Sequence, residues 1–404
     1  MTALVLLVGR EAQVESTTSA LVRRLILERE FDFVDWTLDA AQVKTAQSWL
    51  NDQAYLSADE SKQFILNYLG LLEQIQRLEA RINQIYTDPN ETYPEAGGLP
   101  LRTELEELRI RQSQRQPLAE EIFQNQVTTS LAGLGLTLGG QPIPPVSFHT
   151  TPLPMALIVS PRDVIRQEAN LEINPGLTAD GQSALEDEID RALAVSSLVV
   201  PLGGIGTYPT MILETTSLPW LAEVTAHEWV HNFLSLRPLG ISYLSTPELR
   251  TMNETAASLA GKEIGEALIA RFYPELIPAP PSPAQLEGPE DSPPAPPAFD
   301  FRAEMRATRV RTDELLALGK IDEAELYMEL RRRVFVEQGY SIRKLNQAYF
   351  AFYGAYADEP GAPGADPVGP AVVELRQRSP SLAAFLKRIS WYTSFEQLQR
   401  ALEE

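Results

Sequence analysis

The sequence TAHEWVHNFL, residues 225–234, places two of the chain's three histidines four positions apart, with a glutamate directly after the first. Positions i and i+4 lie above one another on the same face of a helix, so His227 and His231 can present two imidazole nitrogens to one metal ion. Glu228 lies beside them, where a carboxylate can take a proton from a water on the metal. This HExxH pattern predicts a helix that carries a catalytic zinc site.

Two histidines leave such a zinc in need of a third protein ligand, and no histidine follows His231. A carboxylate must then serve. Glu254 is the best candidate, because it stands early on the next predicted helix, where Ser258 and Gly261 are small enough to let two helices approach closely. Three other glutamates compete for this role. Glu248 lies in the capping turn of the helix, and Glu263 and Glu266 lie at spacings typical of a solvated face. His149 is interpreted as an ordinary loop histidine.

Composition excludes several classes of function. The chain has 404 residues, and its 55 acidic against 34 basic residues give a formal charge of -21, which argues against nucleic acid or anionic lipid as a partner. The absence of cysteine excludes disulfides and thiolate metal sites, and it leaves a cytoplasmic or a membrane-anchored extracytoplasmic location open. The apolar run in MTALVLLVGR is shorter than the roughly 20 residues of a membrane span, yet membrane association through this N-terminus remains an alternative.

The first third of the chain is predicted to be helical. Between residues 57 and 88 apolar residues recur in steps of four and three and form a coiled-coil seam: Phe64, Tyr68, Leu71, Ile75, Leu78, Ile82 and Ile85. The turn TDPNETYPEAGGLP reverses the chain before a second helix that begins with Leu101, Leu105 and Leu108. We expect a helical hairpin, which either fences substrate or binds a partner, or packs against the rest of the protein.

Beyond residue 140 the pattern changes to short β runs bounded by proline and glycine, in PMALIVS, ANLEINP, SSLVVPLGG and TMILETT. One predicted helix interrupts them, starting at Ser183 with a capping box at Glu186. The glycine-rich pieces GLGLTLGG and GGIGTYP match no phosphate-binding motif and are interpreted as turns.

Capping residues mark the two helices of the predicted metal site. Ser217 and Pro219 begin the HExxH helix, which stops before Pro238, and Thr246 with Pro247 begin the next helix, which runs to about residue 273. The fold class is α+β, with an N-terminal helical hairpin region (1–140), a catalytic core (141–275), a Pro-rich loop or linker (276–300) and a C-terminal helical subdomain (301–404). In the last part, Gly319 and Gly339 are predicted helix ends, and a final helical pair follows the segment ADEPGAPGADPVGP.

These motifs resemble the gluzincin group of zinc metallopeptidases, in which HExxH is followed by a glutamate ligand on the next long helix. MNETAASLAG is similar to the Asn-Glu-x-x-Ala signature of the aminopeptidase N branch at Asn253, Glu254 and Ala257. The order of the later helices is closer to a bacterial group described as predicted aminopeptidases, over about residues 157–400. The sequence departs from these enzymes in the longer gap between His231 and Glu254, in the absence of a GAMEN-type strand, and in Ser258, where related enzymes often carry aspartate.

The resemblance implies a zincin-like mixed sheet before the active-site helices, with TMILETT as an edge strand that pairs with extended substrate. It also directs attention to LNQAYFAFYGAYA, where Asn346, Tyr349, Tyr353 and Tyr356 recur in steps of three, four and three. The predicted-aminopeptidase group has a tyrosine on an Asn-x-Ala…Tyr helix. This tyrosine corresponds to Tyr356, and Tyr353 is the second candidate. We expect a phenol here to donate to the developing oxyanion and Asn346 to contact substrate; an aromatic packing stripe is the alternative.

The predicted function is zinc-dependent hydrolysis of peptides or proteins, with His227, His231 and Glu254 as ligands of Zn²⁺ and Glu228 as general base. An aminopeptidase must also bind a substrate ammonium, for which Glu214 in TMILETT is the candidate and Glu223, one turn before His227, a second. These acids and the resemblance favour an aminopeptidase over an endopeptidase. A zincin-fold binding or scaffold protein that uses the hairpin is the rival, and the sequence indicates no oligomeric state.

Overall fold

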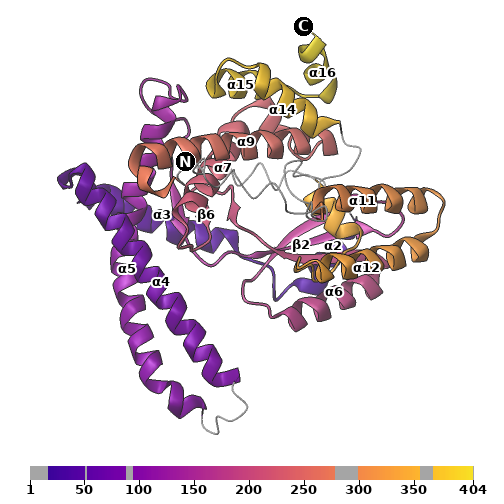
Figure 1. Ribbon diagram of the computed structural model, residues 1–404, viewed down its shortest axis with the longest axis horizontal. Helices are drawn as coiled ribbons and strands as arrows, with labels where there is room; N and C mark the ends of the chain where they lie inside the picture. Colours follow the sequence, from indigo (N-terminus) through magenta and orange to yellow (C-terminus); the bar gives the residue numbers. More distant parts are fainter. Residues whose placement is uncertain (1–16, 51, 88–93, 278–298, 355–366, 404) are drawn as a thin grey trace, which may run out of the picture.

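The computed structural model describes residues 17–50, 52–87, 94–277, 299–354 and 367–403. This part of the chain is mostly helical with two small β-sheets, which agrees with the predicted α+β class (Figure 1). The apolar N-terminal run, most of the Pro-rich segment and Tyr356 lie outside the described residues. Among the described helices, none is both long and apolar enough to cross a membrane.

One sheet has the order β3-β2-β4, with both neighbours antiparallel to the central strand, and comprises β2 (Met155–Pro161), β3 (Ala169–Ile173) and β4 (Val195–Pro201). Leu157 and Val159 face α2 (Thr17–Ile26) and α6 (Ala179–Leu193). Ala156 and Ile158 face the opposite side, where they pack on α11 (Phe301–Ala317), α12 (Ile321–Glu337) and α13 (Gln347–Tyr353). Because helices cover both faces, the strand MALIVSP is almost continuously apolar instead of alternating.

The second sheet has the order β1-β6-β5 and comprises β1 (Phe148–Thr150), β5 (Gly204–Ile205) and β6 (Thr210–Ile212). Strand β6 runs parallel to β1 and antiparallel to β5, with Gly204 paired to Ile212. The prediction of an edge strand at TMILETT is therefore wrong, because β6 is the inner strand. The two edge strands are β1 and β5, and β5 lies within the GGIGTYP piece that is interpreted above as a turn.

Two buried helices follow this sheet and lie at the centre of the largest hydrophobic core. Helix α7 (Leu218–Ser235) begins at the N-cap Ser217, and α9 (Pro247–Phe272) begins at Thr246, whose side chain accepts a hydrogen bond from Leu249 N. These starts agree with the capping prediction. Gly261 allows close packing of the pair, since a Cβ atom there would lie 2.9 Å from His227 Cβ, and Gly265 does the same against the backbone of Glu223.

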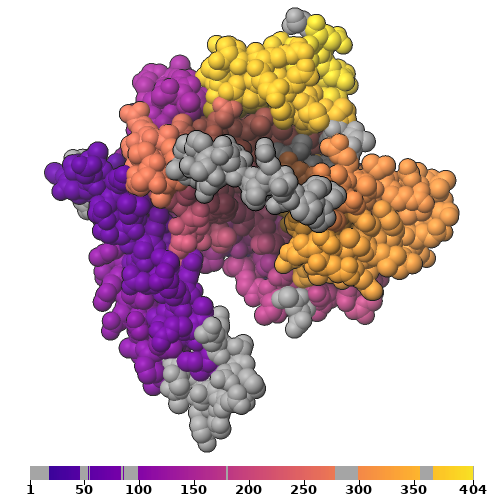
Figure 2. All heavy atoms as spheres, in the orientation of Figure 1, coloured from indigo at the N-terminus to yellow at the C-terminus, as the bar shows by residue number. Residues whose placement is uncertain are grey.

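The predicted hairpin is present as α4 (Ala58–Thr87) and α5 (Pro94–Gly133). Its seam residues Leu71, Ile75, Leu78 and Ile82 pack against Leu108 of α5 in a small core of their own. The other half of the hairpin joins the large core around α7 and α9. Figures 1 and 2 show that the outer half stands away from the body, so the predicted packing role describes the inner half of the hairpin, and a role in binding substrate or a partner stays a prediction.

The predicted division into regions does not follow the packing. In the 1–140 region, α2 joins the β3-β2-β4 sheet, and only the later helices form the hairpin, after α3 (Phe33–Leu50) and a short 3-10 turn (Asp52–Tyr55). In the 301–404 region, α11 to α13 cover that same sheet, whereas α14 (Val368–Arg378), α15 (Leu382–Ile389) and α16 (Phe395–Glu403) pack on the core around α9. The predicted final helical pair is thus three helices (Figure 1).

Helix α6 also departs from its prediction. It starts at Ala179, with Thr178 as the N-cap, and not at Ser183 with Glu186 in a capping box. Glu186 is buried and accepts hydrogen bonds from Val199 N and from the guanidinium of Arg343. The capping-box pattern fails here because this carboxylate ties the helix to β4 and to the segment before α13.

We expect Gly261→Ala to destabilise the protein by up to about 2 kcal/mol. Alanine gains about 1 kcal/mol in helix propensity, but a methyl group at this position would overlap the backbone of α7, and overpacking costs about 1–3 kcal/mol. The midpoint of urea unfolding in the presence of a chelator measures the change. Gly70→Ala on α4 is the matched control, because an added Cβ atom there meets nothing within 4 Å, and it should raise the midpoint. Equal shifts in the two variants would contradict tight packing at Gly261.

Candidate metal centre

The two histidines of the HExxH helix point at a common position. His227 Nε2 and His231 Nε2 lie 3.0 Å apart, and the two rings meet edge to face with centroids 4.7 Å apart. Two imidazole nitrogens that both carry a lone pair repel one another at this distance unless a proton or a cation lies between them. The helical spacing read from the sequence is therefore realised, and it creates a site that favours a positive charge.

Glu254 completes the cluster from α9. Its Oε2 atom lies 3.7 Å from His227 Nε2 and 3.4 Å from His231 Nε2. This oxygen is buried and has no hydrogen-bond partner. In a tetrahedral zinc site, bonds of about 2.0–2.1 Å place neighbouring ligand atoms about 3.3–3.4 Å apart. The three atoms thus have the identity, the spacing and the unsatisfied oxygen that fit Zn²⁺, and they form a group suited to a metal within the described residues.

Two further side chains orient these ligands. Asn253 Oδ1 lies 2.8 Å from His231 Nδ1, which places a ring proton on Nδ1 and directs Nε2 at the cluster. The hydroxyl of Tyr243 donates a hydrogen bond to Glu254 Oε1. Burial and the adjacent Glu254 carboxylate raise the pKa of Tyr243, so its phenol remains a donor. Of the two, Asn253 stands within the Asn-Glu motif, whereas the sequence analysis did not identify Tyr243.

The cluster without a metal is an ion pair. Burial alone lowers the pKa of an imidazole, but the Glu254 carboxylate outweighs burial and, with Glu228 and Asn253, raises the pKa of His231 to about 9. Burial likewise opposes ionisation of Glu254, yet His231 and His227 hold its pKa well below the usual value. A metal must therefore displace a proton from His231, so metal affinity should fall as the pH decreases.

Glu228 is buried beside the ligands and lies against strand β5. A Cβ atom on Gly204 would lie 2.7 Å from Glu228 Oε1, and one on Gly206 would lie 3.4 Å from Glu228 Oε2 and 3.3 Å from His231 Cβ. Only glycine leaves room for the carboxylate here. This role of GGIGTYP was not predicted from the sequence, although glycine inside a strand is a sign of close approach by another group.

Glu214, the predicted ammonium anchor, already has partners. It follows strand β6, and both of its carboxylate oxygens lie 3.2 Å from Arg109 Nη1, while Gln112 donates a further hydrogen bond. Both partners come from α5, so Glu214 fastens the hairpin to the segment that leads into α7. Glu223 on α7, the second acid predicted to bind a substrate ammonium, is exposed.

Asn346 and the tyrosines occupy the other sheet. Asn346 is the N-cap of α13, with its amide donating to Ser197 O and accepting from Tyr349 N, so its predicted contact with substrate is replaced by a structural role. Tyr353 packs on Tyr349, with ring centroids 4.5 Å apart, and both join the core on β2 and β4. These contacts agree with the alternative of an aromatic packing stripe. Tyr356 lies outside the described residues.

The other candidate ligands lie elsewhere. Glu263 pairs with Arg376 of α14 at 2.6 and 2.7 Å, and Glu248 and Glu266 are exposed. His149 is in strand β1 and not in a loop, and its Nδ1 lies 3.1 Å from Glu120, a buried carboxylate of α5.

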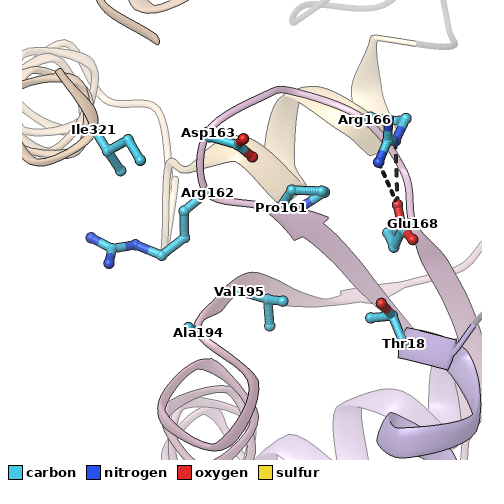
Figure 3. A pocket seen from close by; sticks show the side chains of 9 residues that line it. All are labelled: Thr18, Pro161, Arg162, Asp163, Arg166, Glu168, Ala194, Val195 and Ile321. Carbon is cyan, nitrogen blue, oxygen red and sulfur yellow. Dashed lines mark hydrogen bonds and ion pairs between the residues drawn. The ribbon is translucent and has the colours of Figure 1, made fainter. Parts of the chain in front are cut away.

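A separate pocket of about 420 Å³ opens where β2 ends, beside the end of α6 and the start of α12 (Figure 3). Arg162 and Arg166 line it, but Arg162 pairs with Glu325 and Arg166 with Glu168. Because both guanidinium groups have carboxylate partners, the pocket carries no clear preference for an anionic ligand.

Comparison with known protein families, with curated proteins and with solved structures finds no match to this chain.

We expect Asn253→Ala to weaken zinc binding by about 10- to 100-fold, because loss of the hydrogen bond to His231 frees the ring and its tautomer. Competition with a chelating indicator measures the dissociation constant. Asn346→Ala is the matched control: it removes a buried asparagine cap and should cost about 1 kcal/mol of stability without changing zinc affinity. A parental zinc affinity in Asn253→Ala would contradict the orienting role.

Proposed function

We propose that the protein is a zinc-dependent hydrolase of peptide bonds. The observation that carries this proposal is the convergence of His227 Nε2, His231 Nε2 and Glu254 Oε2, a buried oxygen with no hydrogen-bond partner, on one position, with the Glu228 carboxylate next to them. Structural zinc sites are usually closed by four protein ligands, whereas three ligands leave a position for water and substrate. The donor set therefore supports a catalytic and not a structural metal.

Zn²⁺ bound here would polarise the scissile carbonyl and lower the pKa of a water molecule to about 7. Glu228 is the general base, because it follows His227 directly on α7 and is not a member of the ligand group. Its carboxylate accepts the proton of the attacking water and later gives it to the leaving amine. Asn253 and Tyr243 keep His231 and Glu254 in the orientation that this chemistry requires.

Substrate binding is assigned to strand β5. This strand is one of the two edges of its sheet, and Gly204 brings its backbone against Glu228. An extended peptide that pairs with an edge strand gains main-chain hydrogen bonds, and its carbonyl groups then lie beside the base. With the two buried helices α7 and α9, this arrangement supports a zincin-like core, and peptides or unfolded protein segments as substrates.

Amino-terminal specificity is the second half of the proposal. It rests on the resemblance to predicted aminopeptidases and on Glu223, since the Glu214 carboxylate is engaged by Arg109 and Gln112. That ion pair specifically favours an endopeptidase as the second candidate. The rival role as a scaffold draws support from the outer half of the α4–α5 hairpin, which stands away from the body (Figure 2).

We expect Glu228→Gln to bind zinc with the stoichiometry of the parent protein and to lose peptide hydrolysis by at least about 100-fold, since general bases typically contribute 10²–10⁴-fold. Metal analysis and a peptide-library digest provide the two readouts. Glu266→Gln on the exposed face of α9 is the control and should retain activity. Hydrolysis by Glu228→Gln at the parental rate would rule out this mechanism.

We expect Glu214→Gln to leave KM for free-amine peptides at the parental value, because the Glu214 carboxylate binds Arg109 and not substrate. Steady-state kinetics on matched peptide pairs give KM for each. In the same assay, an aminopeptidase should leave N-acetylated peptides uncut, whereas an endopeptidase should cut them at internal bonds. A KM that rises only for free-amine peptides in Glu214→Gln would restore Glu214 as the ammonium anchor.

A further inference from the structure

The connection between α7 and α9 is held firmly against the core. It contains the short helix α8 (Pro238–Ile241), in which Leu239 is fully buried and donates its N–H to Ser390 O at 3.1 Å. Gly240 lies directly on the backbone of Leu234 at the end of α7, where a Cβ atom would overlap the carbonyl group.

Tyr243 follows this anchored turn and points back at the metal cluster. Its N–H donates to Gly240 O at 3.2 Å, and its ring meets His231 edge to face with centroids 6.2 Å apart. Its hydroxyl donates to Glu254 Oε1. The backbone of the turn thus determines where the phenol lies, and the phenol in turn contacts a predicted ligand.

The hydrogen bond from Tyr243 gives the two oxygens of the Glu254 carboxylate different surroundings. Oε1 of Glu254 is engaged by Tyr243, while Oε2 is buried without a partner and faces both histidine nitrogens. A carboxylate with one oxygen occupied in this way can offer only the other to a metal without losing a buried hydrogen bond. Without the phenol, the side chain would be free to rotate and to present both oxygens.

We propose that Tyr243 is a positioning residue that holds Glu254 as a one-oxygen metal ligand and so keeps the remaining metal position open for water and substrate. The inference rests on the proposed metal site and adds a residue that neither HExxH nor the Asn-Glu motif contains. It also assigns a purpose to the anchored connection between α7 and α9, which delivers this phenol.

The test is the metal affinity and the visible spectrum of the full-length Tyr243→Phe variant. We expect its Kd for Zn²⁺ to rise about 10- to 100-fold, as is typical when a group that orients a metal ligand is lost. With Co²⁺ in place of zinc, the visible absorption should weaken and shift, because a two-oxygen Glu254 raises the coordination number. Tyr273→Phe is the matched control: its buried hydroxyl donates to Gln126 at 2.9 Å, away from the cluster, so both readouts should equal those of the parent.

A double variant separates positioning from a general loss of stability. If Tyr243 acts through Glu254, adding Tyr243→Phe to Glu254→Gln should change the zinc Kd less than about twofold beyond Glu254→Gln alone. The double variant still provides a test if Tyr243→Phe alone does not fold. In Tyr243→Phe the buried Glu254 carboxylate loses its hydrogen bond from the phenol, and Glu254→Gln removes the charge of that carboxylate.

The outcomes distinguish this inference from the proposed function. A parental Kd and Co²⁺ spectrum in Tyr243→Phe, or an equal loss of affinity with and without Glu254→Gln, overturns the role of Tyr243 only. A changed Kd and spectrum in a protein that hydrolyses no peptide supports the role of Tyr243 and overturns the peptidase. A parent protein that binds neither ion overturns both.

Discussion

The close packing of α7 on α9 is the constraint on which the rest of the site depends. His227, His231 and Glu228 lie on one helix and Glu254 on the other, so the distance between the two backbones sets the spacing of the proposed metal ligands. Gly261 lies against His227 itself, and Gly265 lies one turn further along against Glu223. A larger side chain at either position would move the carboxylate away from the imidazoles.

The surrounding elements reinforce this pair. Strand β5 presses on the opposite side of Glu228 through Gly204, and the anchored connection after α7 brings Tyr243 to Glu254. The hairpin joins the same assembly, because Arg109 of α5 pairs with Glu214 just before α7 begins. Groups that carry charge in the buried centre therefore face either one another or the position that a cation would occupy, which limits the energetic cost of burying them.

Features set by local periodicity were predictable from the sequence. The i, i+4 histidines, the caps Ser217 and Thr246, and the hairpin seam each follow from the geometry of one helix or of neighbouring helices. Features set by contacts between distant segments were not. Strand β5 has two residues in a glycine-rich piece, too short for alternation to be visible, and the Arg109–Glu214 ion pair joins residues 105 positions apart. Likewise, nothing in the helical pattern after residue 300 indicates that α11 to α13 and α14 to α16 cover different parts of the core.

X-ray absorption at the zinc edge of the zinc-loaded full-length protein tests the central claim most directly. The account predicts one zinc ion per chain with a first shell of two imidazole nitrogens at about 2.0–2.1 Å and oxygen ligands at about 2.0–2.2 Å, in four- or five-fold coordination. The imidazole signal should be lost when His227 and His231 are both replaced by alanine. A shell of oxygen atoms alone, or a signal that is unchanged in the double alanine variant, would contradict a zinc site built from these two helices.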